Sequence, residues 1–365
     1  MLREQAIEKV DQLLPLMPPF VAEFVELKTA DEYSPNTILE YLKNYQQFFQ
    51  WLIDQQHVPE INISNISIES IENLSLRVAT QYKSYLLRRK KQNSKKINED
   101  GSLKESSSTL SKVTIQRNIT ALKVLFKFLS ESANNKTNKP YLTHNIMNEI
   151  SNVTDRQTLQ ARADLLEDKL FLDDETDNYL SFIRDIYPTT LSKQAVKYYN
   201  RDCERDLAIN ALMLASGLRL SEVVSLNVED LNFDQNRVLV IRKGDKTDSV
   251  RIAAFAMEYL AKYLSIRDSR YQPGKYETAL FLSISKGSSK RITGSAIEKM
   301  VEKYSSQFRV RVTPHKLRHT LATRLYQQTG NLVLTAQQLG HSSTTTTTLY
   351  VHIDNNKTTD ALNSL

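Results

Sequence analysis

The sequence is poor in cysteine and has no long apolar run, and both absences narrow the kinds of protein it can be. Its 365 residues include one cysteine, Cys203, so no disulfide can form within the chain. We interpret Cys203 as a small buried side chain in a reducing cytosol. No stretch approaches the roughly eighteen apolar residues of a membrane helix, so no membrane insertion is predicted. Residues 1–14 are amphipathic and include acidic side chains, which argues against a secretory or transit signal and for a cytoplasmic protein.

Carboxylates with the spacing of metal ligands are also missing, so the sequence predicts neither a metal site nor a cofactor. Its charges fall instead into blocks. The net charge is +6, with +10 over residues 81–140, +11 over residues 241–330 and acidic stretches between them. One basic block in each half of the chain is typical of two DNA-facing surfaces. For the basic run 88–96 alone, a solvated loop is an equally good interpretation.

The length is too great for one ordinary core and fits two domains. We expect a helical DNA-binding domain over residues 1–152, a linker over 153–168 and a second domain over 169–365. In the first domain, the pair Ser34–Pro35 is typical of a helix start, and apolar residues follow it at three- and four-residue spacing. Residues 92–111 are polar and lack periodicity, which predicts a loop that is mobile.

A second clear helix is predicted from Val113 to Leu129, with an apolar stripe beside basic residues. We consider it the best candidate for an element that faces a DNA groove, although a core helix with a solvated basic face would show the same pattern. The basic residues on or beside its polar side are Lys112, Arg117, Lys123 and Lys127.

The second domain is expected to be mainly helical with a small antiparallel sheet. A helix from Arg205 to Ser216 should end at Gly217 in a left-handed cap. Residues 237–242 and 249–254 are strand-like and flank a polar turn, which predicts a hairpin. Further on, the pattern favours a helix over 293–308, a short strand-like segment over 309–312 and a helix that starts at Thr313–Pro314.

Four short motifs follow one another in this domain, and each is weak by itself. They are GLRLSE at 217–222, KGDK at 243–246, HKLRH at 315–319, and LGH at 339–341 with Tyr350 nine residues later. In this order and spacing, the set resembles the Arg–Lys–His–Arg–His–Tyr signature of the tyrosine recombinase family. The catalytic half is similar to the Xer branch, and the whole chain looks closest to the Xer proteins that act as a single recombinase.

The resemblance implies a role for each matching residue. Tyr350 would be the nucleophile that forms a phosphotyrosyl ester with DNA. Arg219 and Arg318 would grip the phosphate oxygens with planar, permanently charged forks. His315 and His341 would be further phosphate donors, with His315 also helping to accept the tyrosine proton.

For the general acid that protonates the leaving 5′-hydroxyl we prefer Lys243, with Lys246 as its rival and as a candidate DNA contact. His319 is interpreted as a structural histidine. Glu222 and Asp206 could orient Arg219 or be ordinary helix-surface acids. Five threonines at 344–348 are weak helix formers, which favours a mobile segment before Tyr350 or, equally, threonines packed on a neighbouring helix.

The resemblance also implies a C-shaped clamp on double-stranded DNA, a homotetramer on two DNA sites and control by an FtsK-type DNA translocase. The expected reaction is site-specific recombination through a 3′-phosphotyrosyl intermediate and a Holliday junction, with chromosome dimers resolved at a dif-like site. Alternatives are a phage or mobile-element integrase of the same family, an enzyme resembling type IB topoisomerases, and a DNA-binding protein without catalysis.

Overall fold

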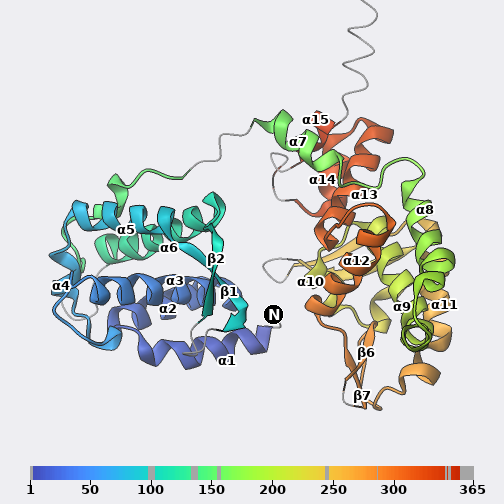
Figure 1. Cartoon of the computed structure of the whole chain (residues 1–365), viewed down its shortest axis with the longest axis horizontal. Coiled ribbons are helices and arrows are strands. Elements are labelled where there is room, and N and C mark those ends of the chain that lie inside the picture. The colour runs from blue at the N-terminus through green and yellow to red at the C-terminus, as the bar shows by residue number, and fades with distance from the viewer. Residues whose placement is uncertain are drawn as a thin grey trace, which may run out of the picture. The chain divides into compact units, whose positions relative to one another are not determined.

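The computed structural model describes residues 3–97, 103–132, 139–153, 158–242, 246–285, 287–341, 343 and 347–353. The chain divides into two compact units, Met1–Arg156 and Gln157–Leu365 (Figure 1). Each unit has a hydrophobic core of its own. Within the described residues, no helix is both long and apolar enough to cross a membrane.

The first unit is a bundle of helices with one hairpin. Its α-helices are α1 (Arg3–Leu13), α2 (Pro19–Ala30), α3 (Pro35–Asp54), α4 (Ile68–Glu72), α5 (Leu76–Arg88) and α6 (Lys112–Glu131). Short 3₁₀ turns lie at Leu14–Leu16 (η1), Ile63–Asn65 (η2) and Ile146–Glu149 (η3). The hairpin consists of β1 (Lys90–Ile97) and β2 (Leu103–Thr109).

Local signals in the sequence set the two longest helices of this unit. The Ser34 hydroxyl accepts a hydrogen bond from the Thr37 amide at 3.2 Å and caps α3. Ser111 caps α6 in the same way. The apolar faces of α3 and α6 pack together in a core rich in aromatic rings, where Phe48 meets Tyr82 edge to face. Both predicted helices are therefore confirmed.

The loop predicted for residues 92–111 is wrong for most of its length. β1 and β2 pair as antiparallel strands, with partners that include Lys90 with Thr109 and Asn93 with Lys104. The register shifts twice along the pair. Apart from Ile97 and Leu103, the residues of both strands are polar. The sequence therefore shows no alternation of apolar and polar positions, whereas backbone hydrogen bonds need no such pattern. Residues 98–102 lie outside the described part of the chain.

The second unit is mostly helical. Its α-helices are α7 (Leu159–Glu167), α8 (Glu175–Ser181), α9 (Lys193–Ser216), α10 (Leu220–Ser225), α11 (Ala254–Tyr271), α12 (Gly294–Phe308), α13 (Pro314–Thr329), α14 (Leu332–Leu339) and α15 (Leu349–Ile353). A π-turn, η4 (Phe182–Ile186), and 3₁₀ turns η5 (Tyr187–Thr190) and η6 (Val228–Asp230) join them. The strands are β3 (Leu231–Asn232), β4 (Arg237–Ile241), β5 (Thr247–Arg251), β6 (Leu282–Ser285) and β7 (Ser288–Arg291).

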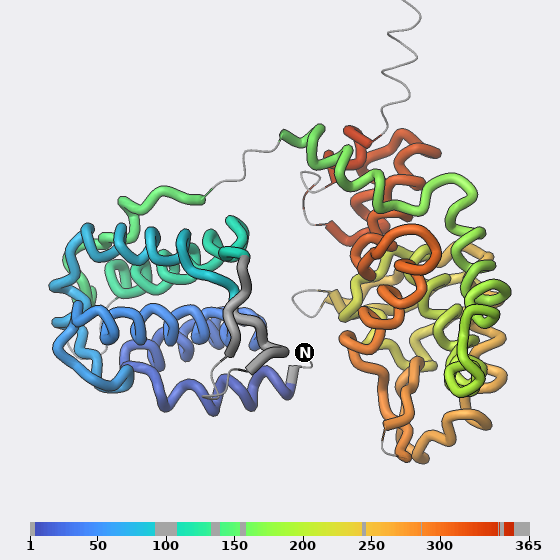
Figure 2. Tube along the Cα trace, in the orientation of Figure 1, coloured from blue at the N-terminus to red at the C-terminus, as the bar shows by residue number. Residues whose placement is uncertain are grey.

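Helix α9 runs through the core of this unit and packs against α11 and α13 (Figure 2). Strands β3, β4 and β5 form an antiparallel sheet in which Val238 pairs with Val250, both buried toward the core. Helix α9 ends at Gly217, whose φ of 69° is left-handed. A Cβ at Gly217 would lie 2.9 Å from the side chains of Leu321 and Leu339, so the turn needs glycine for space as well as for conformation.

Four boundaries in the second unit differ from expectation. Helix α9 begins at Lys193, twelve residues before the expected start at Arg205. Helix α7 lies inside the range expected for the linker and belongs to the second unit, because its apolar side packs on α15. The strand-like segment 309–312 is not a strand, since it has no neighbour to pair with among the described residues. The second hairpin strand is Thr247–Arg251 rather than 249–254, because α11 begins at Ala254.

Candidate active site

Arg219 stands at the start of α10, where the chain resumes a helix after the turn at Gly217. Its Nη1 atom donates to Glu222 Oε1 at 2.8 Å, and its backbone amide donates to Glu222 Oε2 at 2.7 Å. Glu222 is buried and Arg219 is partly exposed. Glu222 therefore fixes the Arg219 guanidinium group through these hydrogen bonds and leaves part of the group open to solvent. Asp206, the other acid considered for this role, contacts Arg205 and Tyr304 instead.

Arg318 lies on α13 and is almost fully buried, with 1% of its surface exposed. Its Nη1 atom donates to the Gly217 carbonyl at 2.5 Å and its Nη2 atom to the Leu339 carbonyl at 2.6 Å. Burial, and then the positive charge of Arg219, lower the pKa of Arg318 to about 10. The Arg318 guanidinium group still carries its charge at neutral pH. Its burial beside the positive charge of Arg219 favours the binding of an anion.

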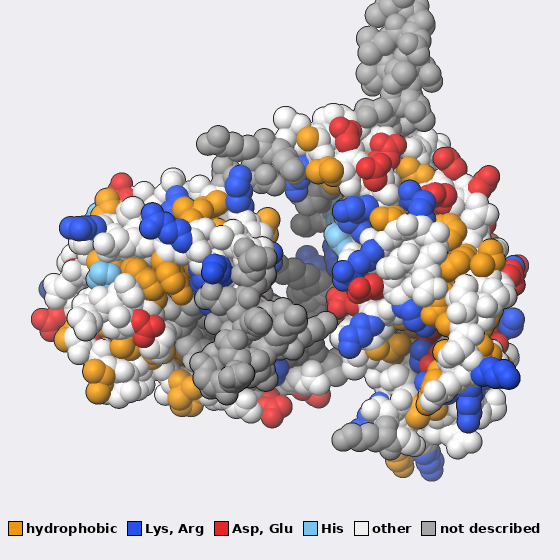
Figure 3. All heavy atoms as spheres, viewed as in Figure 1, with side chains coloured by type: hydrophobic (Ala, Val, Ile, Leu, Met, Phe, Trp, Pro, Cys, Tyr) orange, Lys and Arg blue, Asp and Glu red, His pale blue; other side chains and the backbone are white. Residues whose placement is uncertain are grey.

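The carboxyl end of α14 is the point at which three arginines meet. Arg318 and Arg242 donate to the Leu339 carbonyl, and Arg219 Nη2 donates to the Gly340 carbonyl at 3.1 Å. Helix ends of this kind carry partial negative charge and carbonyls without partners in the helix, so they attract cations. Three guanidinium groups face two carboxylates here, Glu222 and Asp248, which leaves a net positive charge. Figure 3 shows Lys and Arg side chains of the second unit gathered beside a histidine.

The histidines of the motifs cluster around these arginines. The rings of His315 and His319 meet edge to face, with centroids 4.5 Å apart. His341 follows Gly340, and its Nδ1 atom lies 2.9 Å from the Thr347 hydroxyl. Burial, followed by nearby positive charges, lowers the pKa of His341 to about 4 and that of His319 to about 3. The pKa of the more exposed His315 is lowered by partial dehydration and then by Arg318. The depressed pKa values favour neutral rings at neutral pH.

Tyr350 is carried by the short helix α15 and is buried, with 1% of its surface exposed. It packs in a small cluster with residues of α7, α13 and α14 that include Leu166, Ala322 and Leu339. Its phenol oxygen lies 2.8 Å from His319 Nδ1. Burial raises the pKa of Tyr350 to about 12, although Arg318 acts in the opposite direction. The phenol is therefore protonated at neutral pH and can donate to a neutral imidazole.

The structure brings Arg219, Arg318 and His341 together around the end of α14. His315 and Tyr350 are linked to this group through His319. Lys243 lies outside the described residues, and Lys246, directly before β5, has an exposed side chain.

The four basic residues considered on α6 belong to the first unit. Lys112 and Arg117 are exposed, Lys123 contacts Asn152, and Lys127 pairs with Glu131. In the described part of the chain, no group of three or more His, Cys, Asp or Glu side chains could hold a metal ion.

Two residues of the site were missed by sequence reasoning. His319 was interpreted as structural, yet it is the imidazole that contacts the Tyr350 phenol. Arg242 was counted only as the last residue of a strand, yet its buried guanidinium contacts Glu222 and α14. The one sequence signal for Arg242 was its place directly before the Lys243 motif. A charged side chain that is buried seldom lacks a partner.

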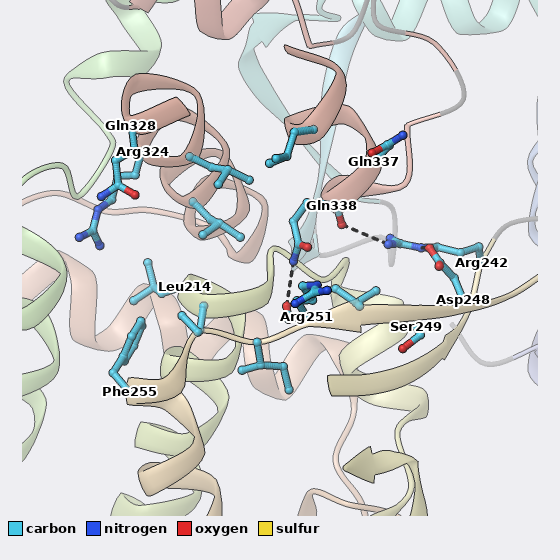
Figure 4. Close-up of a pocket in the computed structure, with 17 residues that line it drawn as sticks. Leu214, Arg242, Asp248, Ser249, Arg251, Phe255, Arg324, Gln328, Gln337 and Gln338 are labelled. Atoms are coloured by element: carbon cyan, nitrogen blue, oxygen red, sulfur yellow. Dashed lines mark hydrogen bonds and ion pairs between the residues drawn. The ribbon is translucent and has the colours of Figure 1, made fainter. Parts of the chain in front are cut away.

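A pocket of about 770 Å³ lies between β5, α13 and α14, and Arg242 and Asp248 of the site are among its lining residues. Figure 4 shows Arg242 and Gln338 toward one end and Arg324 and Gln328 toward the other. Leu334, Leu325 and Phe255 are among its apolar lining residues. An apolar floor with polar ends suits a peptide segment better than a phosphate.

Comparisons with known proteins identify the family of this chain. The phage integrase family model matches residues 190–357. Tyrosine recombinase XerS of Streptococcus pneumoniae (strain Hungary19A-6) is 45% identical over 365 residues, which is 100% of both chains. The chain belongs to the tyrosine recombinases, and it is a site-specific recombinase of the Xer type.

Solved structures agree on the fold. XerH recombinase bound to a palindromic difH substrate matches with a TM-score of 0.58 and 22% identity, over 90% of this chain and 78% of the other. A lambda integrase (75–356) dimer bound to a COC′ core site matches with a TM-score of 0.53 and 12% identity, over 92% and 95%. The expected fold class is thereby confirmed.

Proposed function

We propose that this chain cleaves DNA with Tyr350 and, with further copies of itself, resolves chromosome dimers at a dif-like site. The observation that carries the chemistry is the convergence of Arg219, Arg318 and His341 on one helix end, with the Tyr350 phenol bonded to the histidine next to Arg318. This arrangement offers fixed positive charge where a phosphodiester must bind and an oxygen nucleophile close to it.

In the proposed reaction, Arg219 and Arg318 hold the non-bridging oxygens of the phosphate and stabilise the charge that grows on them. Neutral His315 and His341 add N–H donors. Because Arg219 is partly exposed while Arg318 is buried, we infer that Arg219 meets the DNA first. Arg318 would then exchange part of its bonding to carbonyls for the phosphate.

Tyr350 Oη attacks phosphorus, and the bond between phosphorus and the 5′ oxygen breaks. The phenol proton passes to an imidazole, and Lys243 gives a proton to the leaving 5′ oxygen. The resulting 3′-phosphotyrosyl ester conserves the energy of the broken bond. A 5′-hydroxyl of the partner duplex can therefore attack the ester and release Tyr350, and two such exchanges pass through a Holliday junction.

The buried phenol adds a condition to this scheme. With 1% of its surface exposed and its oxygen bonded to His319, Tyr350 is shielded from DNA in the free protein. We infer that α15 shifts when the site is occupied, so that the phenol leaves His319 and points at phosphorus. Such control suits an enzyme that uses half of its four nucleophiles at each exchange step.

The first unit is proposed to grip the DNA face opposite the catalytic unit, through the exposed Lys112 and Arg117 of α6 and through its neighbours Lys123 and Lys127. Electrostatic contacts of this kind position a protein on DNA without reading its sequence. The enzyme would work in the cytoplasm, bound to the nucleoid, under the control of an FtsK-type DNA translocase. Support comes from the XerS relatives and from XerH, which was solved on a difH substrate.

A trapping experiment tests the activity and its target together. The full chain is incubated with genomic fragments that carry nicks, so that cleavage releases a short strand and leaves the protein attached. The attached DNA is then sequenced. Recovery of one chromosomal locus with inverted repeats supports dimer resolution, whereas recovery of the ends of a mobile element would make the chain an integrase. Absence of denaturation-resistant complexes on all fragments would overturn the proposal.

The proposed assembly is a homotetramer on two DNA sites, with the tail of each copy seated in the pocket of the next. Residues 354–365 lie outside the described part of the chain, and their sequence ends in the apolar residues Leu362 and Leu365. A head-to-tail contact repeated around four copies closes into a ring. Deletion of residues 355–365 and the substitution Leu334→Asp in the pocket should both weaken synapsis more than binding to a single site. Val333→Asp, on the same helix but not among the lining residues, is the matched control.

A further inference from the structure

Thr347 contacts both the helix of the nucleophile and a histidine proposed to bind phosphate, and the proposed reaction gives it no part. Its side chain is buried, with 0% of its surface exposed. Its carbonyl oxygen accepts a hydrogen bond from the Tyr350 amide at 3.0 Å, in the turn that leads into α15. Its hydroxyl oxygen lies 2.9 Å from His341 Nδ1. One residue therefore joins the start of the nucleophile's helix to a histidine of the site.

The direction of the hydrogen bond between Thr347 and His341 follows from burial. Either group can donate, because a hydroxyl and a neutral imidazole each have a proton to give and a site that accepts. A buried hydroxyl needs a partner for its proton, and water does not reach this one. Among the described residues, His341 Nδ1 is the atom that hydrogen-bonds to it. If the ring donated instead, the hydroxyl proton would lose that acceptor, so we infer that the hydroxyl donates to Nδ1.

This direction sets which nitrogen of His341 carries the proton. The pKa of His341 is lowered to about 4, by burial first and then by the positive charge of Arg318, so the ring is neutral at neutral pH. A neutral imidazole has one N–H group. With Nδ1 acting as the acceptor, the proton lies on Nε2, and Nε2 is the nitrogen that can donate to a second group.

His341 stands where such a donor is useful. It directly follows Gly340, whose carbonyl accepts from Arg219, and the carbonyl before that one accepts from Arg318. A phosphate held by these arginines would meet an N–H donor in one tautomer of His341 and a lone pair in the other. The donor attracts a phosphate oxygen, whereas the lone pair repels it. The tautomer therefore decides whether His341 helps or hinders the binding of phosphate.

We propose that Thr347 is a positioning residue: its hydroxyl fixes His341 in the tautomer with the proton on Nε2 and so makes the ring a donor toward the scissile phosphate. This inference rests on the proposed role of His341 in binding that phosphate. The donor is arranged before the DNA arrives, so no ring proton has to move while negative charge grows on the phosphate oxygens. Thr347 acts through His341 rather than on the phosphate itself.

Side-chain variants of Thr347 test the role of the hydroxyl, because each keeps the carbonyl that accepts from Tyr350. Thr347→Val has the same shape without the hydroxyl and should cleave a suicide substrate at least about fivefold more slowly. Thr347→Ser keeps the hydroxyl and should retain most of the wild-type rate. Thr323→Val is the matched control, since the Thr323 hydroxyl is also buried and has no hydrogen-bond partner among the described residues. The cleavage rate of this control should not change.

Thr347→Ala covers the case in which Thr347→Val does not fold. Thr347→Ala and Thr347→Ser both lose the threonine methyl group, and only Thr347→Ser keeps the hydroxyl. The alanine variant should therefore be the slower of the two by a similar factor. Equal rates for these two variants, or a wild-type rate for Thr347→Val, would overturn the proposal.

A second substitution shows whether Thr347 acts through His341. His341→Gln has an amide N–H group in the region of Nε2 and no tautomers, so the Thr347 hydroxyl no longer selects the donor. Addition of Thr347→Val to His341→Gln should therefore slow cleavage no further. The same loss in both backgrounds would mean that Thr347 acts elsewhere, and the proposal would fail.

Nitrogen NMR of the free protein with ¹⁵N-labelled histidine reads the tautomer directly. The chain has six histidines, and the signals of His341 are those that disappear in His341→Gln. Wild-type protein near neutral pH should show a protonated Nε2 and an unprotonated Nδ1, and Thr347→Val should show a mixture of tautomers. A proton on Nδ1 in the wild type, or the wild-type pattern in Thr347→Val, would overturn the proposal. The measurement uses neither DNA nor activity, so it separates this inference from the proposed function, which fails if the wild type forms no covalent complex on suicide DNA.

Discussion

Replacement of Tyr350 by phenylalanine separates the proposed chemistry from folding and from DNA binding. The change removes one oxygen from a ring that is 1% exposed, so the packing of α15 against α7 and α13 should remain. The lost contact is the hydrogen bond to His319, which contributes about 1 kcal/mol to the free energy of unfolding. For a unit of this size, such a loss lowers the melting temperature by roughly 2–4 °C.

Cleavage should fall to zero in the Tyr350→Phe variant, because no oxygen remains to attack phosphorus. DNA binding should be nearly unchanged, because the contacts to phosphate come from other residues. The assays are a denaturing gel with suicide DNA for covalent complexes, a mobility shift for binding and a thermal melt. Tyr326→Phe is the matched control, since this tyrosine packs against the same cluster and should keep full cleavage. Denaturation-resistant adducts from Tyr350→Phe would refute the assignment of the nucleophile.

Four further results are expected. Arg318→Lys loses the fork that spans two carbonyls, so its free energy of unfolding should drop by roughly 1–3 kcal/mol and its cleavage rate by about 100-fold or more, as urea titration and single-turnover assays would show. His341 has a folded pKa of about 4, below its usual value near 6.5, so the unfolded chain takes up a proton more readily between these limits. The stability that this group contributes is complete above about pH 6.5 and is lost as the pH falls toward 4. The decline in urea midpoints over that range should be smaller in His341→Gln. Arg117→Ala should reduce the salt dependence of DNA binding by about one unit of slope, and an unchanged slope would remove Arg117 from the interface. Hydrogen exchange should be faster in α15 than in α13 of the free protein, and equal protection would contradict a movable nucleophile.

Local physics explains how much of the fold could be predicted from sequence. Helix caps and apolar stripes act over a few residues, so Ser34, the helix over 113–129 and the left-handed turn at Gly217 were predictable without any partner in view. The same holds for the hairpin that carries Lys243, whose strands alternate around a polar turn. The hairpin β1–β2 was not predicted, because polar strands that pair through their backbones show no alternation of apolar and polar residues.

The class of enzyme could also be predicted, because the order and spacing of the arginine, histidine and tyrosine motifs survive in the linear sequence. Contacts between distant segments could not. The Arg318 guanidinium bonds a carbonyl 101 positions away, and Arg242 bonds one 97 positions away. No local sequence pattern indicates which distant carbonyl either arginine contacts.

Sequence alone therefore indicated the side chains that we propose as sources of charge, nucleophile and proton transfer, since residue types limit the chemistry that a site can perform. Tertiary packing alone decided that Tyr350 is buried beside His319, that Arg242 joins the hairpin to α14, and that α7 packs against α15. These features depend on the burial of apolar surface and on carbonyls left open at a helix end. Both become defined only when segments far apart in the chain come together.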